Sequence, residues 1–176
     1  EEFEKIFQRN WIGLGRGDRF AVAGDYETMN LGVKPVIVIR DHDGVLRVFA
    51  NTCRHRGARL LNDSGNCKLI RCPFHGWTYK LDGTLSGAPR MNKVSNFTRS
   101  DHELVSYHAE ERLGFIFVCL DHTAPNLDDY LGDFAEFHTS WPIESLVTTR
   151  RRSLNVDCNW KAFLDVFNEY YHLPYV

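Results

Sequence analysis

Two short clusters of cysteine and histidine carry the residue types and the spacing best suited to chemistry. The first is Cys53-Arg54-His55 and the second is Cys72-Pro73-Phe74-His75, with 16 residues between them. Each cluster offers one thiolate and one imidazole, and these ligands suit both zinc and iron–sulfur centres. A tetrahedral zinc site could take all four side chains around one ion. A [2Fe–2S] site could instead place the two cysteines on one iron and the two histidines on the other.

The pattern C-x-H-x16-C-x2-H resembles the signature of the Rieske family. The flanking residues match as well, in Asn51-Thr52-Cys53-Arg54-His55-Arg56-Gly57 and Cys72-Pro73-Phe74-His75-Gly76-Trp77. The resemblance implies a Rieske [2Fe–2S] cluster on two hairpin loops, with four ligands: Cys53, His55, Cys72 and His75. The glycines of the two loops would let backbone N–H groups approach the cluster sulfurs. Zinc fits less well, because zinc sites with two cysteines and two histidines usually place the histidines together.

The remaining cysteines and histidines narrow the kind of Rieske protein that the sequence resembles. Respiratory-type members carry an extra cysteine in each loop, whereas neither loop of this chain has one. We expect Cys67, which precedes the second loop, to be a small buried side chain and not a ligand. An odd total of five cysteines argues against a secreted disulfide framework. Surface or core roles are expected for the histidines without a partner at ligand spacing, namely His42, His102, His108, His122 and His138.

The last segment resembles the start of the catalytic domain of Rieske non-haem iron oxygenases. It begins with Asn159-Trp160-Lys161 and ends with Glu169-Tyr170-Tyr171-His172. In that family, two histidines and one carboxylate hold mononuclear Fe(II) and leave positions open for O2 and substrate. The resemblance implies that His172 is one of these ligands and that the other two lie beyond this sequence. It also implies that Glu169 is an electron bridge, which binds no iron and reaches a Rieske histidine of the neighbouring subunit.

Short strands separated by turns are predicted for most of the chain. Apolar patterning predicts strands over residues 20–26, 35–40, 45–50, 68–71, 77–80, 104–110, 114–120 and 147–157. Asp43-Gly44 predicts a hairpin turn between the second and third of these strands. Helices are predicted over residues 2–9, from a cap at Asn126 to 131, and over 159–172, which places Glu169 and His172 on one helical face. We therefore expect a mainly β fold: a Rieske-type antiparallel β sandwich with two cluster-binding hairpin loops, short helices and the truncated start of an α+β catalytic domain.

Length and composition bound the remaining possibilities. The chain has 176 residues, 43% hydrophobic and 25% charged, as expected for one globular domain and a piece of another. We expect a Rieske domain with an N-terminal helix over residues 1–130 and the start of a catalytic domain over residues 131–176. The net charge of −2 favours neither nucleic acid nor a membrane as a partner, and no apolar run approaches the roughly 18 residues of a spanning helix. Since the start lacks a secretory pattern, we expect a cytoplasmic protein.

The function implied by the resemblance is that of a terminal oxygenase component. Its cluster would relay electrons to mononuclear Fe(II), where O2 is activated to hydroxylate a small organic substrate, usually an aromatic hydrocarbon in this family. Electrons would come from NAD(P)H through a flavin reductase, a ferredoxin or both, and full-length subunits would form a homotrimer or an α3β3 assembly. Glu169 departs from the family's usual Asp, which favours a quaternary-ammonium or an N- or O-methyl substrate as the alternative. A Rieske ferredoxin-type electron carrier with a C-terminal extension is a further alternative.

Overall fold

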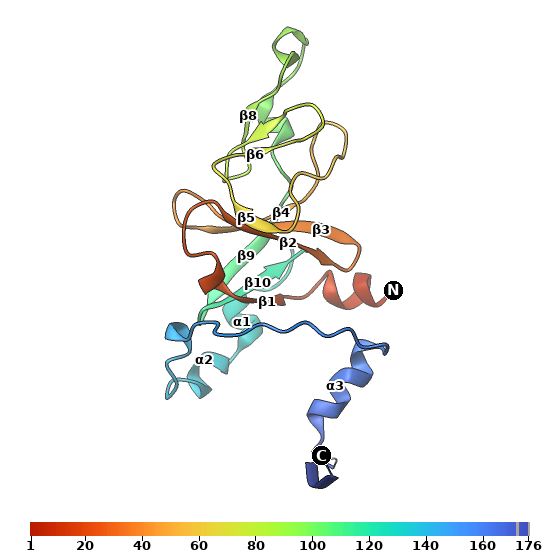
Figure 1. Cartoon of the computed structure of the whole chain (residues 1–176), viewed down its shortest axis with the longest axis vertical. Helices are drawn as coiled ribbons and strands as arrows, with labels where there is room; N and C mark the ends of the chain where they lie inside the picture. The colour runs from red at the N-terminus through yellow and green to blue at the C-terminus, as the bar shows by residue number, and fades with distance from the viewer. Residues whose placement is uncertain (172, 176) are drawn as a thin grey trace.

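Ten strands in two antiparallel sheets form the framework of this computed structural model, which describes residues 1–171 and 173–175 (Figure 1). The strands are β1 (Ile12–Arg16), β2 (Asp25–Leu31), β3 (Lys34–Arg40), β4 (Leu46–Ala50), β5 (Ser64–Asn66), β6 (Ile70–Arg71), β7 (Thr78–Tyr79), β8 (Leu85–Gly87), β9 (Ser106–Arg112) and β10 (Phe115–Cys119). A seven-stranded sheet has the order β1-β10-β9-β4-β3-β2-β5, and a small sheet has the order β6-β7-β8. The mainly β, antiparallel fold expected from the sequence is confirmed.

Short helices flank the sheets. They are α1 (Leu127–Leu131), α2 (Phe134–Phe137), α3 (Trp160–Asn168), the π-helical turn η1 (Phe3–Phe7) and the 3-10 turns η2 (Gly17–Arg19), η3 (Met91–Lys93), η4 (Arg99–His102), η5 (Ile143–Ser145) and η6 (Leu173–Tyr175). Asn126 caps α1 as predicted, because its side chain accepts hydrogen bonds from the N–H groups of Asp128 and Asp129. Within the described part of the chain, every helix is too short or too polar to cross a membrane.

The strand β3 is buried on both faces, which explains its unbroken apolar run. Its residues 36–39 are all inaccessible to solvent. Because successive side chains point to opposite faces of a strand, Val36 and Val38 pack into one core and Ile37 and Ile39 into another. The second core includes side chains of the small sheet and both cysteines of the Cys–His clusters. The large sheet therefore serves as the platform on which the two loops stand.

The predicted hairpin turn at Asp43-Gly44 is confirmed, and it joins β3 to β4. The buried carboxylate of Asp41 organises this turn. Its Oδ1 accepts hydrogen bonds from the N–H groups of Asp43 at 2.9 Å and Val45 at 2.8 Å, and its Oδ2 accepts one from Arg47 Nε at 2.8 Å. A buried carboxylate is tolerated when its oxygens are satisfied in this way.

Two predicted strands are placed differently in the structure. The strand expected over 20–26 begins only at Asp25, because Gly24, with a φ of +90°, turns the chain just before it. The segment 147–157 forms no strand, since no described strand lies beside it to complete a ladder of hydrogen bonds. Thr148 is instead held by Asp18, whose carboxylate accepts from its N–H at 2.7 Å and its hydroxyl at 3.1 Å.

The predicted helix over 159–172 is shorter than expected. Asn159 caps α3, which ends at Asn168, and Glu169 has extended backbone angles (φ −125°, ψ 156°). Two tyrosines and then Pro174 follow, and such residues do not favour a continued helix. Glu169 therefore lies outside the helix, and His172, which was expected on the same helical face, lies outside the described residues.

Candidate metal centre

The two Cys–His clusters lie on loops with the same backbone arrangement. In each loop, the cysteine N–H donates to the carbonyl five residues along, and the cysteine carbonyl accepts from the N–H of a glycine four residues along. These bonds measure 2.8 and 2.9 Å in the loop of Cys53, and 2.7 and 3.1 Å in the loop of Cys72. The glycines, Gly57 and Gly76, have φ angles of +72° and +71°, which L side chains rarely adopt. Two matching turns thus present one cysteine and one histidine each.

The four side chains of the predicted cluster site lie on one end of the molecule, above the large sheet. Cys53 and Cys72 are buried in the core between the sheets, whereas His55 is half-buried and His75 is exposed. The two imidazole rings lie edge to face, with centroids 4.7 Å apart and planes at 72°. The thiols therefore lie inside and the imidazoles at the surface, where His75 is the more exposed of the two.

A buried atom of His55 fits a bound metal. Its Nδ1 is inaccessible to solvent and has no hydrogen-bond partner, which is costly for a polar atom. A metal ion at this nitrogen would satisfy its lone pair. In the described residues, no group of three or more Cys, His, Asp and Glu side chains converges as a single ion would require. A two-iron cluster needs only two protein ligands per iron, so these residues fit a [2Fe–2S] cluster better than a tetrahedral zinc ion.

Tyr79 contacts the sulfur of Cys53, and the sequence assigned it no role. Its hydroxyl lies 3.3 Å from Cys53 Sγ and accepts a hydrogen bond from the N–H of Arg54 at 3.1 Å. Since the hydroxyl oxygen accepts from the backbone, its proton can be donated to the sulfur. Burial raises the pKa of the Cys53 thiol and raises the pKa of Tyr79 far above its usual range. A metal ion at the sulfur reverses the preference of the thiol for its proton.

Asn51 supports the first loop from within the core. Its Oδ1 accepts hydrogen bonds from the N–H groups of Leu60 and Leu61, both at 3.0 Å, and its Nδ2 donates to the carbonyl of Leu61 at 2.8 Å. Its own N–H donates to the carbonyl of Pro35 in β3 at 2.9 Å. The matched sequence run contained Asn51, but only the structure reveals that it ties the loop to the sheet.

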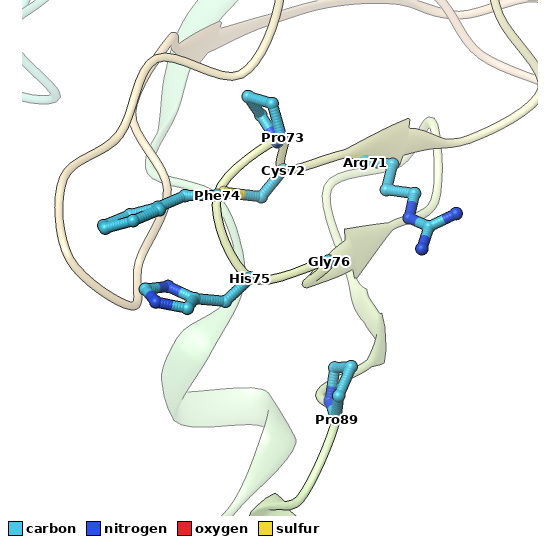
Figure 2. A pocket seen from close by; sticks show the side chains of 7 residues that line it. All are labelled: Arg71, Cys72, Pro73, Phe74, His75, Gly76 and Pro89. Atoms are coloured by element: carbon cyan, nitrogen blue, oxygen red, sulfur yellow. The ribbon is translucent and has the colours of Figure 1, made fainter.

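The second loop borders an open pocket of about 450 Å³ (Figure 2). The residues that line it are Arg71, Cys72, Pro73, Phe74, His75, Gly76 and Pro89. Figure 2 shows Phe74 and His75 extending to the same side of the loop, whereas Arg71 points the other way. The Phe74 side chain is 61% exposed. An apolar ring therefore stands beside the exposed imidazole at the surface.

Glu169 lies far from these loops. Figure 1 shows the C-terminal segment with α3 at the opposite end of the long axis from the small sheet. A carboxylate oxygen of Glu169 accepts a hydrogen bond from the N–H of Tyr171. The structure does not bring Glu169 together with Cys53, His55, Cys72 and His75 in one chain.

Two family descriptions match the chain. "Rieske [2Fe-2S] domain" matches residues 10–98, which include both Cys–His loops. "Ring hydroxylating alpha subunit (catalytic domain)" matches residues 143–176, which include α3 and Glu169. The first match covers the segment that resembles a Rieske domain, and the second covers the segment that resembles the start of a catalytic domain.

Individual proteins match over nearly the whole chain. It is 37% identical over 174 residues to the carnitine monooxygenase oxygenase subunit of Acinetobacter pittii (strain PHEA-2), covering 97% of this chain and 47% of that protein. A quaternary ammonium Rieske monooxygenase, described for carnitine oxidation and inter-subunit electron transfer, has a TM-score of 0.93 at 36% identity, covering 98% and 48%. Naphthalene 1,2-dioxygenase with indole in its active site has a TM-score of 0.71 at 38% identity, covering 78% and 32%. The chain spans about half the length of the curated relatives it matches.

Proposed function

The chain belongs to the family of Rieske oxygenase α subunits, and from this premise we propose that it forms the electron-relaying part of a terminal oxygenase. The observation that carries the proposal is the pair of matching loops, which present two buried thiols and two imidazoles at one end of the molecule. The match of residues 143–176 to a catalytic domain favours an oxygenase over a ferredoxin-type carrier. We place the division between the two domains near residue 130.

The loops would hold the [2Fe–2S] cluster with two protein ligands on each iron. Cys53 and Cys72 would bind one iron through Sγ, and His55 and His75 would bind the other. When bound, the cluster supplies one-electron chemistry. The buried cysteines would keep it out of water, while the exposed His75 would offer an edge from which an electron could leave. With the cluster bound to Cys53 Sγ, the hydroxyl of Tyr79 would donate to that sulfur and would stabilise the negative charge gained on reduction.

The tail would contribute to the mononuclear Fe(II) site of the whole protein. We assign His172 as one ligand and Glu169 as the bridge that receives electrons from a Rieske histidine. Glu169 follows α3, and α3 lies at the opposite end of the molecule's long axis from the loops. The histidine that Glu169 reaches would therefore belong to a second copy. A homotrimer or an α3β3 ring supplies such a neighbour. We further propose a cytoplasmic enzyme that draws electrons from NAD(P)H through a reductase or a ferredoxin.

The substrate class that we propose is a quaternary-ammonium or N-methyl compound. Two points support it: the family resemblance implies that Glu169 stands at a position where Asp is usual, and a structure that matches with a TM-score of 0.93 is described as a quaternary ammonium Rieske monooxygenase. The second candidate is an aromatic ring, as in naphthalene 1,2-dioxygenase, which matches less of the fold.

The test is carried out on the full-length protein with its reductase. We expect about two irons and two acid-labile sulfides per Rieske domain, with the EPR spectrum of a histidine-ligated cluster. Cys72→Ser should abolish that spectrum, and the control Cys67→Ser, at a half-buried cysteine outside the loops, should preserve it. Stoichiometric zinc without labile sulfide would overturn the proposal.

Substrate class is tested by O2 uptake in the presence of NAD(P)H. L-Carnitine or glycine betaine should stimulate uptake and incorporate one atom of labelled O2 into product, whereas naphthalene should not. Stimulation by naphthalene alone would assign the aromatic class. A loaded cluster without O2 uptake stimulated by any of these three compounds would favour the electron-carrier alternative.

A further inference from the structure

A series of aromatic rings leads away from His55 toward the surface. The Trp77 indole stacks on the His55 imidazole, with centroids 4.8 Å apart and planes within 9°. His102 lies 5.5 Å from Trp77, and Phe97 lies 5.7 Å from Trp77 and 4.8 Å from His102. Trp77 is buried, whereas Phe97 and His102 are half-buried. The rings therefore form a continuous contact from a predicted cluster ligand to the segment that carries η3 and η4.

The same end of the molecule carries a concentrated positive charge. Residues 53–103 hold nine Lys and Arg and four Asp and Glu, a net charge of +5, whereas the rest of the chain carries −7. The nine cations are all exposed: Arg54, Arg56, Arg59, Lys68, Arg71, Lys80, Arg90, Lys93 and Arg99. In the part of the chain that the structure describes, the ion pairs are formed by other basic groups. None of these nine side chains has a carboxylate of a described residue within 4.0 Å. This end, which we name the basic tip, thus attracts an acidic surface.

We propose that the basic tip is the docking surface for an acidic electron-carrier protein and that electrons enter through the ring series Phe97–His102–Trp77 to His55. The inference rests on the proposed function. In this transfer, the reduced centre of the carrier would lose one electron and be oxidised. One iron of the cluster would gain that electron and be reduced. The rings provide a path and undergo no net oxidation or reduction.

The proposed entry path ends at His55 and does not involve His75. His75 is exposed and stands beside Phe74, so it is free to contact a carboxylate of another subunit. His55 is instead half-buried, with Trp77 stacked on one face of its ring and His102 beyond Trp77, and a carrier protein would reach it through these rings. Two imidazoles on one iron would then serve different directions of transfer, uptake through His55 and release through His75.

Charge reversal at the basic tip tests the docking surface. The full-length holoprotein carrying Lys93→Glu and Arg99→Glu is mixed with a photoreduced plant-type [2Fe–2S] ferredoxin, an acidic carrier of lower potential. We expect the second-order rate of cluster reduction at low ionic strength to fall about tenfold or more. The deficit should shrink as salt screens the charges. The control, Arg9→Glu with Arg150→Glu, makes the same change in net charge away from the tip and should stay within about twofold of the wild type.

Ring removal tests the path separately. Phe97→Leu and His102→Leu should slow cluster reduction severalfold at saturating ferredoxin, while the ferredoxin dissociation constant and the cluster potential stay unchanged. Reduction by a neutral photoreduced deazaflavin, which needs no docking, should also be unchanged. Phe137→Leu, at an exposed ring of α2, is the control. If the rings had only a structural role, the variants would change the cluster potential or the cluster content. The ratio of the reduction rate with ferredoxin to the rate with deazaflavin would then stay at its wild-type value.

The outcomes distinguish the two proposals. A wild-type protein that assembles no Rieske cluster would overturn the proposed function, and this inference with it. A loaded cluster with tip variants that behave like their controls would overturn only the inference. Dissociation of the oligomer by the tip variants, measured by sedimentation, would show that a second copy covers the tip, and it would also overturn the docking surface proposed here.

Discussion

Single side chains near the two loops adjust the properties of the predicted cluster site without being its ligands. The spacing of the two Cys–His clusters, together with the family resemblance, predicted Cys53, His55, Cys72 and His75, because metal-binding loops keep their ligands close in sequence. Spacing could not predict Tyr79, whose hydroxyl reaches Cys53 from a strand 26 residues away. A tyrosine in a short strand is an ordinary core residue until the fold shows what its hydroxyl contacts.

The effect of Tyr79 can be measured as a reduction potential. Tyr79→Phe removes a hydrogen bond that stabilises the more negative, reduced cluster, so the potential should fall. A hydrogen bond of about 0.5–1.5 kcal/mol corresponds to about 20–60 mV for a one-electron couple. A titration followed by EPR checks the value, with Tyr107→Phe, in the core on the other side of β3, as the control. Equal potentials in the two variants would mean that the hydroxyl is only a packing group.

At the scale of elements, the matching turns of the two loops depend on glycines with positive φ. Gly57 has a φ of +72° and Gly44, in the β3–β4 turn, has +77°, and neither position crowds an added Cβ. Gly57→Ala and Gly44→Ala should each lower the free energy of unfolding by about 1–2 kcal/mol, the cost of a left-handed L residue. Only Gly57→Ala should also lower the cluster content, because Gly57 closes the loop of Cys53. Denaturant titration and iron analysis test both statements. Equal cluster contents in the two variants would mean that the turn at Gly57 does not support the cluster site.

The β3–β4 turn should also make stability depend on pH. Burial by itself raises the pKa of Asp41, but hydrogen bonds from Arg47, Val45 and Asp43 outweigh burial and lower the pKa below 3.8. A folded-state pKa below the unfolded one means that the carboxylate stabilises the fold above pH 3.8, and the contribution is lost as the pH falls through the lower folded value. Thermal unfolding between pH 6 and pH 2 should therefore show a steeper acid loss for the wild type than for Asp41→Asn. Parallel profiles for the two proteins would contradict this role.

The elements that the sequence predicted well are those that local signals determine. Asp43-Gly44 and the Asn126 cap both lie where predicted. The misplaced elements depend on partners: the segment 147–157 lacks a neighbouring strand, and β5, three exposed residues without an apolar pattern, exists because β2 pairs with it. Pairing over long sequence distances cannot be seen in a local pattern.

At the scale of the whole molecule, the two halves of the proposed function lie apart. The loops stand at one end of the long axis and α3 with Glu169 at the other (Figure 1). The resemblance implied that Glu169 reaches a Rieske histidine of the neighbouring subunit, and the separation within one chain agrees with that expectation, although no local sequence pattern specifies it. If electrons pass from the loops to the site beside Glu169, an oligomer must bring the loops of one copy to the tail of the next.

Mixed oligomers of the full-length protein test this arrangement. Glu169→Ala alone should leave both metal sites loaded and suppress turnover, and Glu169→Asp should cause a partial loss because the shorter side chain reaches less far. Subunits with Glu169→Ala keep the cluster, and subunits with Cys72→Ser keep the bridge, so each homo-oligomer should be inactive. In randomly mixed rings, one contact in four pairs an intact cluster with an intact bridge, and about a quarter of wild-type turnover should return. Within a single chain the two defects could never complement each other, so mixed oligomers as inactive as their parents would place electron transfer inside one subunit and contradict the bridge between neighbours.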